Sequence, residues 1–246
     1  MRIHLLGTSA GTPDPHRAPT AILVEGEGPA LLIDAGDGVA RALARPEFAD
    51  IMIRSIILTH NHADHVSGLP FLFQGWKGSG GRREPVEIIA PGNLGSAFER
   101  WLSALRMAPE RLPFTLEFRS LDAGAVVTAS NHRMEAWTTD HFNGDGTGDR
   151  CFGLTLKLPD GDWVFSSDLG SLDPLRRHLH GVAGLIVEAT HVDPVQAVRI
   201  AKECAVQRII LTHVPPESDV HPIEGAVWAE DGMILETGNS GEAQDD

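Results

Sequence analysis

The chain has 246 residues, a formal net charge of -14 and 42% hydrophobic residues, and these values exclude several classes of protein. Such a chain can bury one large core, and no apolar run approaches the ~18 residues that a transmembrane helix needs. The 34 acidic residues against 20 basic ones argue against electrostatic capture of long nucleic acids. We therefore expect a soluble protein with neither a membrane nor a long nucleic acid as its partner.

The cysteine content and the N-terminal segment favour a location in the cytoplasm. The two cysteines, Cys151 and Cys204, have no spacing typical of a disulfide framework or a cysteine-based zinc site. Before Gly7 the apolar run is only two residues long, which is too short for the core of a signal peptide. We expect a cytoplasmic protein with one domain over residues 1–237 and a mobile acidic tail over residues 238–246.

The first half of the chain predicts short strands followed by helices. Apolar runs bounded by Gly or Pro predict strands at residues 2–6, 21–25 and 30–34, and a helix follows at 39–43. The run at 54–59 is apolar on both faces, as in a buried strand, and leads directly into a cluster of histidines. Beyond that cluster we expect a helix at 68–73, a glycine-rich loop at 75–81, a strand at 86–90 and a helix at 94–106.

The second half predicts a mostly antiparallel set of strands and then a βαβ unit. The antiparallel set, with tight turns such as Pro159-Asp-Gly161, is expected at residues 114–118, 125–128, 134–138, 152–158 and 163–167. Buried-type strands at 185–189 and 208–211 flank a helix at 194–204, which has Pro in its first turn. Strands and helices thus occur in two similar sets, an order that fits sheets with helices outside.

The most informative string is His-x-His-x-Asp-His at residues 60–65. Two imidazoles two residues apart can bind one cation, and the Asp and His that follow can bind a second cation about 3.5–4 Å away. Three histidines and an aspartate directly after an apolar strand would be costly without such a role. The string therefore predicts a dinuclear metal site.

Further ligands are available where later predicted strands end. His141 follows Thr138-Thr-Asp, Asp168 follows Ser166-Ser, and His213 follows Ile210-Leu-Thr. Each of these residues alone would be an ordinary loop residue. Together they can complete two metal sites.

These motifs, in this order, resemble those of the metallo-β-lactamase superfamily over nearly the whole chain. The resemblance implies the αββα sandwich, an α/β fold of four layers. It implies that His60, His62 and His141 bind one metal, that Asp64, His65 and His213 bind the other, and that Asp168 bridges them. Asp34, in Leu31-Leu-Ile-Asp, would support the ligands. Two divalent ions are implied, and we expect them to be zinc. Manganese and iron are alternatives, since His/Asp sites of this kind accept all three metals.

Within the superfamily, the opening Leu5-Leu-Gly-Thr-Ser-Ala-Gly-Thr-Pro13 is similar to the ribonuclease Z and PhnP-like phosphodiesterase branch. The string Glu188-Ala-Thr-His191 falls where that branch carries a catalytic histidine. The resemblance therefore implies a phosphodiester hydrolase with a metal-bridging hydroxide as nucleophile. His191 would protonate or stabilise the leaving group, Glu188 would orient His191, and we assign Asp64 to catalysis as well as to metal binding.

The chain also departs from the tRNA-processing enzymes of that branch. Those enzymes carry a long arm between the third histidine motif and the bridging aspartate, whereas only 26 residues separate His141 from Asp168 here. With the net charge of -14, this favours a small anionic phosphodiester as substrate. The stretch from Gly75 to Arg83 is either a lid or an ordinary surface loop, and its Lys77, Arg82 and Arg83 are candidate anion contacts. A homodimer is compatible with the superfamily.

Two other functions stay open. The same metals could hydrolyse a thioester, a lactone or another carboxyl ester. The lactonase version is weakened because the chain contains no tyrosine, which such lactonases place beside the metals. The second alternative is a non-catalytic accessory protein that keeps the fold and binds a metal or a ligand, but a binding protein has no need for a complete ligand set.

Overall fold

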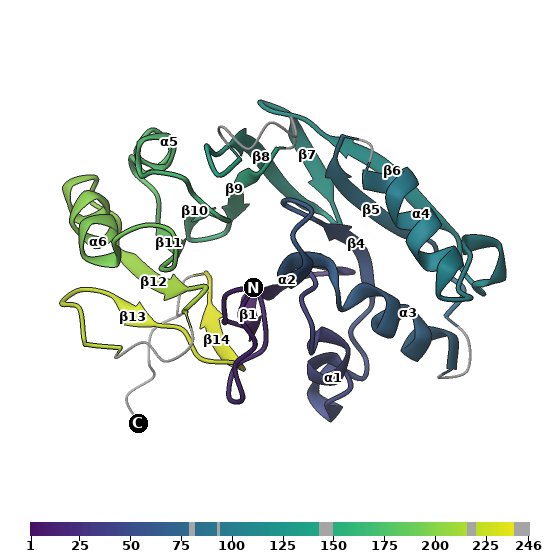
Figure 1. Ribbon diagram of the computed structural model, residues 1–246. Helices are drawn as coiled ribbons and strands as arrows, with labels where there is room; N and C mark the ends of the chain where they lie inside the picture. Colours follow the sequence, from purple (N-terminus) through teal and green to yellow (C-terminus); the bar gives the residue numbers. More distant parts are fainter. Residues whose placement is uncertain (79–81, 93, 143–149, 216–219, 239–246) are drawn as a thin grey trace, which may run out of the picture.

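The computed structural model describes residues 1–78, 82–92, 94–142, 150–215 and 220–238. The described strands form two seven-stranded sheets, with helices α1, α3 and α4 beside one sheet and helices α5 and α6 beside the other (Figure 1). This is the predicted αββα sandwich. The predicted acidic tail lies, apart from Gly238, outside the described residues. Among the described helices, none has the length and apolarity that crossing a bilayer requires.

The first sheet has the order β14-β1-β2-β3-β4-β5-β6. Its strands are β1 (Arg2–Gly7), β2 (Ala21–Glu25), β3 (Ala30–Ile33), β4 (Ile53–Ile57), β5 (Val86–Pro91), β6 (Leu116–Leu121) and β14 (Met233–Glu236). The α-helices of this half are α1 (Val39–Leu43), α2 (Ala63–Val66), α3 (Leu69–Gly78) and α4 (Leu94–Ala104). Two short 3₁₀ helices, η1 (Pro46–Phe48) and η2 (Pro109–Arg111), accompany them.

The second sheet has the order β13-β12-β11-β10-β9-β8-β7. Its strands are β7 (Val126–Ala129), β8 (His132–Thr138), β9 (Phe152–Leu158), β10 (Gly161–Phe165), β11 (Gly184–Glu188), β12 (Arg208–Thr212) and β13 (Val227–Trp228). Helices α5 (Asp173–Arg176) and α6 (Pro194–Glu203) lie on its outer side. The antiparallel β9–β10 hairpin fills most of the short segment between His141 and Asp168.

Three apolar clusters hold the four layers together. The central cluster joins side chains of both sheets, such as Leu5 and Ile33 with Phe152 and Trp163. The other two clusters lie between a sheet and its helices, around Phe73 on one side and among the side chains of α6 on the other. Burial of apolar surface, at about 25 cal/mol per Å², therefore fixes how the sheets face each other. That arrangement in turn positions the loops at the strand ends.

The structure differs from the sequence predictions at several elements. Helix α3 continues through Gly75 to Gly78, where the glycine-rich loop was expected. It continues because the Trp76 ring packs on Phe73 and Phe114, with ring centroids 5.6 and 6.0 Å apart. Arg82, proposed for anion contacts, instead lies over the Trp76 ring at 4.6 Å. Residues 79–81 of the predicted loop lie outside the described part of the chain.

Strand pairing accounts for the remaining differences. The run expected as an antiparallel strand at 114–118 is β6, two residues later, and it pairs in parallel with β5 at the edge of the first sheet. The sequence did not predict α2, α5, β13 or β14. All four are two to four residues long, too short for a periodic pattern, and β14 exists through its antiparallel pairing with β1.

Buried His132 at the start of β8 predicts a pH effect on stability. The residue is 2% exposed and neither ring nitrogen has a hydrogen-bond partner among the described residues. Burial lowers the pKa of its imidazole, so the unfolded chain takes up this proton first as the pH falls. The free energy of unfolding is therefore unaffected by the titration of His132 above about pH 6.5, the pKa of a histidine in the unfolded chain. Below that pH it falls by up to about 1.4 kcal/mol per pH unit.

We expect His132→Phe to flatten the pH dependence of the free energy of unfolding between pH 7.5 and 5.5. Urea denaturation of both proteins at pH 7.5, 6.5 and 5.5 measures it. The other histidines are the same in both proteins, so their contributions cancel in the comparison. Equal slopes for the two proteins would show that His132 does not contribute.

Candidate metal centre

The carboxyl ends of parallel strands bring the predicted ligand loops to one edge of the sandwich. β3, β4 and β5 run parallel in the first sheet, and β10, β11 and β12 run parallel in the second. β8 points the same way as β10, because both pair antiparallel with β9. Loops leaving these strands therefore meet, and the structure brings together all seven predicted ligands: His60, His62, Asp64, His65, His141, Asp168 and His213.

The first ligand group consists of His60, His62, His141 and Asp168. One ligand atom of each lies within 4.8 Å of the others. Asp168 Oδ2 is 3.5 Å from His60 Nε2 and 3.6 Å from His141 Nε2. His141 Nε2 is also 3.3 Å from His62 Nδ1. Four donors thus face one small volume.

The second ligand group consists of Asp64, His65 and His213, with the other oxygen of Asp168 beside it. Asp64 Oδ2 is 3.1 Å from His213 Nε2 and 3.5 Å from His65 Nε2. Asp168 Oδ1 is 3.3 Å from His65 Nε2. The two oxygens of one buried carboxylate therefore face the two groups, as a bridging ligand requires.

The unpaired nitrogens of these groups fit a divalent ion. His60 Nε2 and His65 Nε2 are buried, each faces its ligand group, and neither has a hydrogen-bond partner among the described residues. Two ligands of one zinc ion at about 2.1 Å each stand roughly 3.4 Å apart in tetrahedral geometry. The separations of 3.3 to 3.6 Å around Asp168 match that value. Nitrogen and carboxylate donors in this arrangement suit zinc and its neighbours.

Electrostatics at the centre favours bound positive charge. Burial lowers the pKa of His60, and the charge on neighbouring His65 lowers it further, which keeps His60 in the neutral form that binds metal. Burial opposes charge on His65 too, but the Asp168 and Asp34 carboxylates raise its pKa well above the usual value. Burial would raise the pKa of Asp168, yet the surrounding histidines, His65 and His213 first, hold it well below its usual range.

Asp34 lies behind His65, in the supporting position that the resemblance implies. Asp34 Oδ2 is 2.8 Å from His65 Nδ1, so that His65 Nε2 faces the ligands. The same carboxylate accepts hydrogen bonds of 2.8 Å from the backbone N–H and the hydroxyl of Thr59. Ser167 Oγ donates to Thr59 Oγ1 at 2.8 Å, which ties the loop after β10 to the loop after β4. Carboxylates behind ligating histidines fix the ring and raise its basicity.

Three of the seven non-glycine residues with positive φ in the described part of the chain lie at the centre. Asp34, Ser167 and His213 have φ values of 56°, 52° and 52°, a left-handed conformation that non-glycine residues adopt at a cost of about 1–3 kcal/mol each. The adjacent Gly36 allows close packing, since a Cβ there would stand 2.3 Å from the backbone oxygen of Asp64. The fold therefore holds the ligand loops in conformations that local preference alone would not select.

Glu188 and His191 lie beside the ligand groups. Glu188 is buried and its Oε2 accepts backbone N–H groups of Thr190 and His191 at 2.7 and 2.8 Å. His191 Nδ1 is 3.3 Å from Glu188 Oε1 and 3.9 Å from Asp168 Oδ2, while its side chain is 35% exposed. Burial would raise the pKa of Glu188, but hydrogen bonds with His191 and His213 lower it to about 2. The Glu188 hydrogen bond raises the pKa of His191, against its partial burial.

Sequence reasoning missed several residues that shape the centre. Thr59 and Ser167 were not singled out, although each directly precedes a predicted ligand. Asp140, before His141, accepts the backbone N–H groups of Gly170 and Ser171 at 2.9 Å and so fixes the loop after Asp168. The available signal was adjacency to a ligand. Their partners lie in loops far away in the chain, so the contacts themselves could not be predicted.

Asp34→Ala should weaken metal binding mainly at the second group. We expect a loss of about 10–100-fold in affinity, because His65 loses the acceptor that orients it. Titration against a competing chromophoric chelator measures the affinity of each site. Asp37→Ala is a matched control, since Asp37 is exposed and outside this network. Equal affinities in both variants would contradict the positioning role of Asp34.

Fold and site together define a class of protein, the αββα sandwiches that carry a His/Asp cluster at one sheet edge. The model of a family described as the beta-lactamase superfamily domain matches residues 30–214 of this chain. The chain belongs to that family, as its resemblance predicted.

Known relatives fall in the expected branch. Ribonuclease Z of Bradyrhizobium diazoefficiens is 33% identical over 198 residues, which are 77% of this chain and 62% of that protein. The chain spans about half the length of other ribonucleases Z that it matches. Among solved structures, the short form of human tRNase Z has a TM-score of 0.75 at 23% identity, covering 96% of this chain and 99% of the other. A diphosphatase from the PhnP family has a TM-score of 0.72 at 19% identity, covering 96% and 97%. At these identities the solved structures support the fold.

Proposed function

We propose that this protein is a dinuclear-metal-dependent phosphodiesterase that hydrolyses a small, anionic phosphodiester. The observation that carries the proposal is Asp168, whose Oδ2 faces the first ligand group and whose Oδ1 faces the second. Similarity to a ribonuclease Z supports phosphodiester chemistry. Similarity of fold to a PhnP-family diphosphatase supports a small substrate.

The first group would hold one divalent ion through three histidines, and the second group would hold another through Asp64, His65 and His213. When bound, two such ions polarise a phosphoryl oxygen and lower the pKa of the attacking water. Zinc suits this donor set, and manganese or iron would also bind it. The carboxylates of Asp64 and Asp168 offset only part of the charge of two divalent ions, which would leave a net positive charge that attracts an anion.

Asp64 and His191 would handle the protons of the reaction. Asp64 contacts His213 through Oδ2, and its Oδ1 would accept the proton of the attacking water. His191 is held through Nδ1 by Glu188, so its Nε2 would donate a proton to the leaving oxygen. Glu188 acts as a positioning residue, because it is buried and contacts both the backbone and the ring of His191.

Charge and topology support a small substrate over tRNA. The segment between His141 and Asp168 holds the β9–β10 hairpin where the tRNA-processing enzymes carry an arm. A net charge of -14 repels long polyanions at a distance, while the local site attracts one phosphate. We further propose that the protein acts in the cytoplasm, where its two free, buried cysteines would stay reduced, and that it can form a homodimer.

The test is hydrolysis of bis(p-nitrophenyl) phosphate by the metal-reconstituted protein, with bound metal quantified. We expect turnover with two ions bound, loss of turnover on chelation and recovery when zinc or manganese is returned. A thioester and a lactone are assayed in parallel. A fully loaded protein that leaves the phosphodiester intact and cleaves the thioester or lactone would replace the proposal with carboxyl-ester hydrolysis. A protein inert on all three would favour the accessory role.

A further inference from the structure

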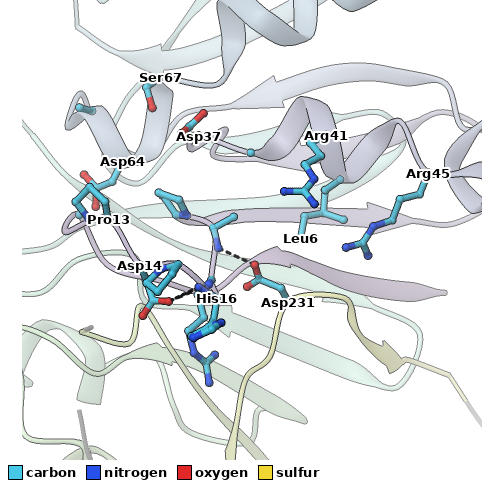
Figure 2. Close-up of a pocket in the computed structure, with 18 residues that line it drawn as sticks. Leu6, Pro13, Asp14, His16, Asp37, Arg41, Arg45, Asp64, Ser67 and Asp231 are labelled. Atoms are coloured by element: carbon cyan, nitrogen blue, oxygen red, sulfur yellow. Dashed lines mark hydrogen bonds between the residues drawn. The ribbon is translucent and has the colours of Figure 1, made fainter. Parts of the chain in front are cut away.

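A cavity of about 690 Å³ adjoins the second ligand group and is not used by the proposed reaction. Asp64 lies at one end of this cavity, and Arg41 and Arg45 lie at the other (Figure 2). Buried Leu6 and Ala42 contribute an apolar wall. The volume lies within the range of sites that enclose a small organic ligand, about 300–1,000 Å³. Of the seven predicted ligands, Asp64 lines this cavity, so the cavity borders the second ligand group through that carboxylate.

Two arginines of the cavity are free to bind a ligand. Arg41 lies in α1, Arg45 follows that helix, and both are exposed. Neither guanidinium forms a hydrogen bond or an ion pair with another of the described residues, and Figure 2 shows both side chains directed along the cavity. Arg17, in contrast, is already engaged, since its Nη1 donates to Thr8 Oγ1 at 2.9 Å and to the backbone oxygen of Ala229 at 2.5 Å.

The acidic side chains of the cavity also divide into those with a hydrogen-bond partner in the protein and those without one. Asp14 accepts the backbone N–H groups of His16 and Arg17, at 2.7 and 3.0 Å. Asp231 accepts the hydroxyl of Thr8 and the backbone N–H of Ala18, both at 2.7 Å. These two carboxylates therefore stabilise the loop that lines the cavity and are not available to a ligand. Asp37 is the exposed acid on the rim near α1, and within the described residues it has no hydrogen-bond partner.

We propose that Arg41 and Arg45 form a subsite for a second anionic group of the substrate, a phosphate set apart from the scissile phosphodiester. A guanidinium without a protein partner binds phosphate through paired N–H groups, and the apolar wall suits the sugar or base that connects the two phosphates. The negative charge of the Asp37 carboxylate lowers the affinity of this subsite for an anion. The substrate class is then a nucleotide-sized phosphodiester with a terminal phosphate. This inference rests on the proposed function.

Two chromogenic esters with the same leaving group test the subsite. One is the p-nitrophenyl ester of thymidine 5′-phosphate, and the other carries an additional 3′-phosphate. With the zinc-loaded protein, we expect a KM for the 3′-phosphorylated ester lower by about tenfold or more. The double variant Arg41→Gln/Arg45→Gln should bring the ratio of the two KM values close to one, and Asp37→Asn should increase the preference. Arg199→Gln, an exposed arginine on α6 outside the cavity, is the matched control and should keep the ratio.

Calorimetry with thymidine 3′,5′-bisphosphate gives a second readout that needs no turnover. Tenfold weaker binding to the double variant supports the subsite, and equal binding overturns it. If the wild type cleaves both esters with equal KM, or if the double variant keeps the preference, the subsite is wrong and the phosphodiesterase stands. If the loaded wild type cleaves neither ester, the proposed function fails, and the calorimetry alone decides whether the cavity binds phosphate.

Discussion

Replacing Asp168 by asparagine should reduce the bound metal from two ions to at most one and lower the phosphodiesterase rate on the order of 1,000-fold. The carboxylate of Asp168 presents one oxygen to each ligand group, and an amide can present its single oxygen to only one. Its NH₂ would point at imidazole nitrogens of the other group and cannot bind a cation. Loss of one ion removes several kcal/mol of stabilisation of the transition state.

Metal analysis and thermal unfolding measure this effect independently of activity. Ions that bind only the folded chain stabilise it by mass action, so added zinc should raise the Tm of the wild type more than that of Asp168→Asn. Asp162→Asn is the matched control, because Asp162 lies on β10, the strand that leads to Asp168, and pairs with exposed Lys157 at the surface. Two bound ions and a wild-type rate in Asp168→Asn would contradict the bridging role.

The fold and most of the candidate site were predictable because they depend on local patterns. Apolar runs placed β4, β10 and β12, and the polar residues directly after each of them are the ones that meet in space. The carboxyl ends of parallel strands lie at one edge, so residues far apart in the chain converge without any specific long-range signal. The spacing within residues 60–65 therefore indicated the histidine string, and their position directly after predicted strands indicated Asp168 and His213 as further candidates.

What could not be predicted depends on how the two sheets face each other. The hydrogen bond from Ser167 to Thr59 joins loops 108 residues apart, and only the packing of the central cluster brings those loops together. The cavity beside Asp64 likewise needs α1 and the turn at Asp231, which are distant in sequence. The continuation of α3 past Gly75 depends on tertiary contacts of Trp76, and these override the local preference of glycine to end a helix.

His191→Ala should lower kcat roughly 100-fold or more on a phosphodiester with an alkoxide leaving group, such as a dinucleotide, while both ions stay bound. The reason lies in its position. The side chain contacts Glu188 and lies beside the bridging carboxylate, yet it remains partly exposed toward solvent and substrate. An alkoxide needs a proton to leave, whereas p-nitrophenolate is a weak base and leaves without one. The loss on bis(p-nitrophenyl) phosphate should therefore be smaller than the loss on the dinucleotide.

The difference between the two substrates separates proton donation from a structural role. If His191 only shaped the site or bound the phosphate, its removal would slow both substrates by the same factor. Glu188→Gln should show the same dependence on the leaving group with a smaller amplitude, because Glu188 acts through His191. His180→Ala, an exposed histidine outside the site, controls for a general effect of histidine removal and should retain the wild-type rate on both substrates. A uniform loss in His191→Ala would exclude His191 as the general acid and leave phosphate binding as its role.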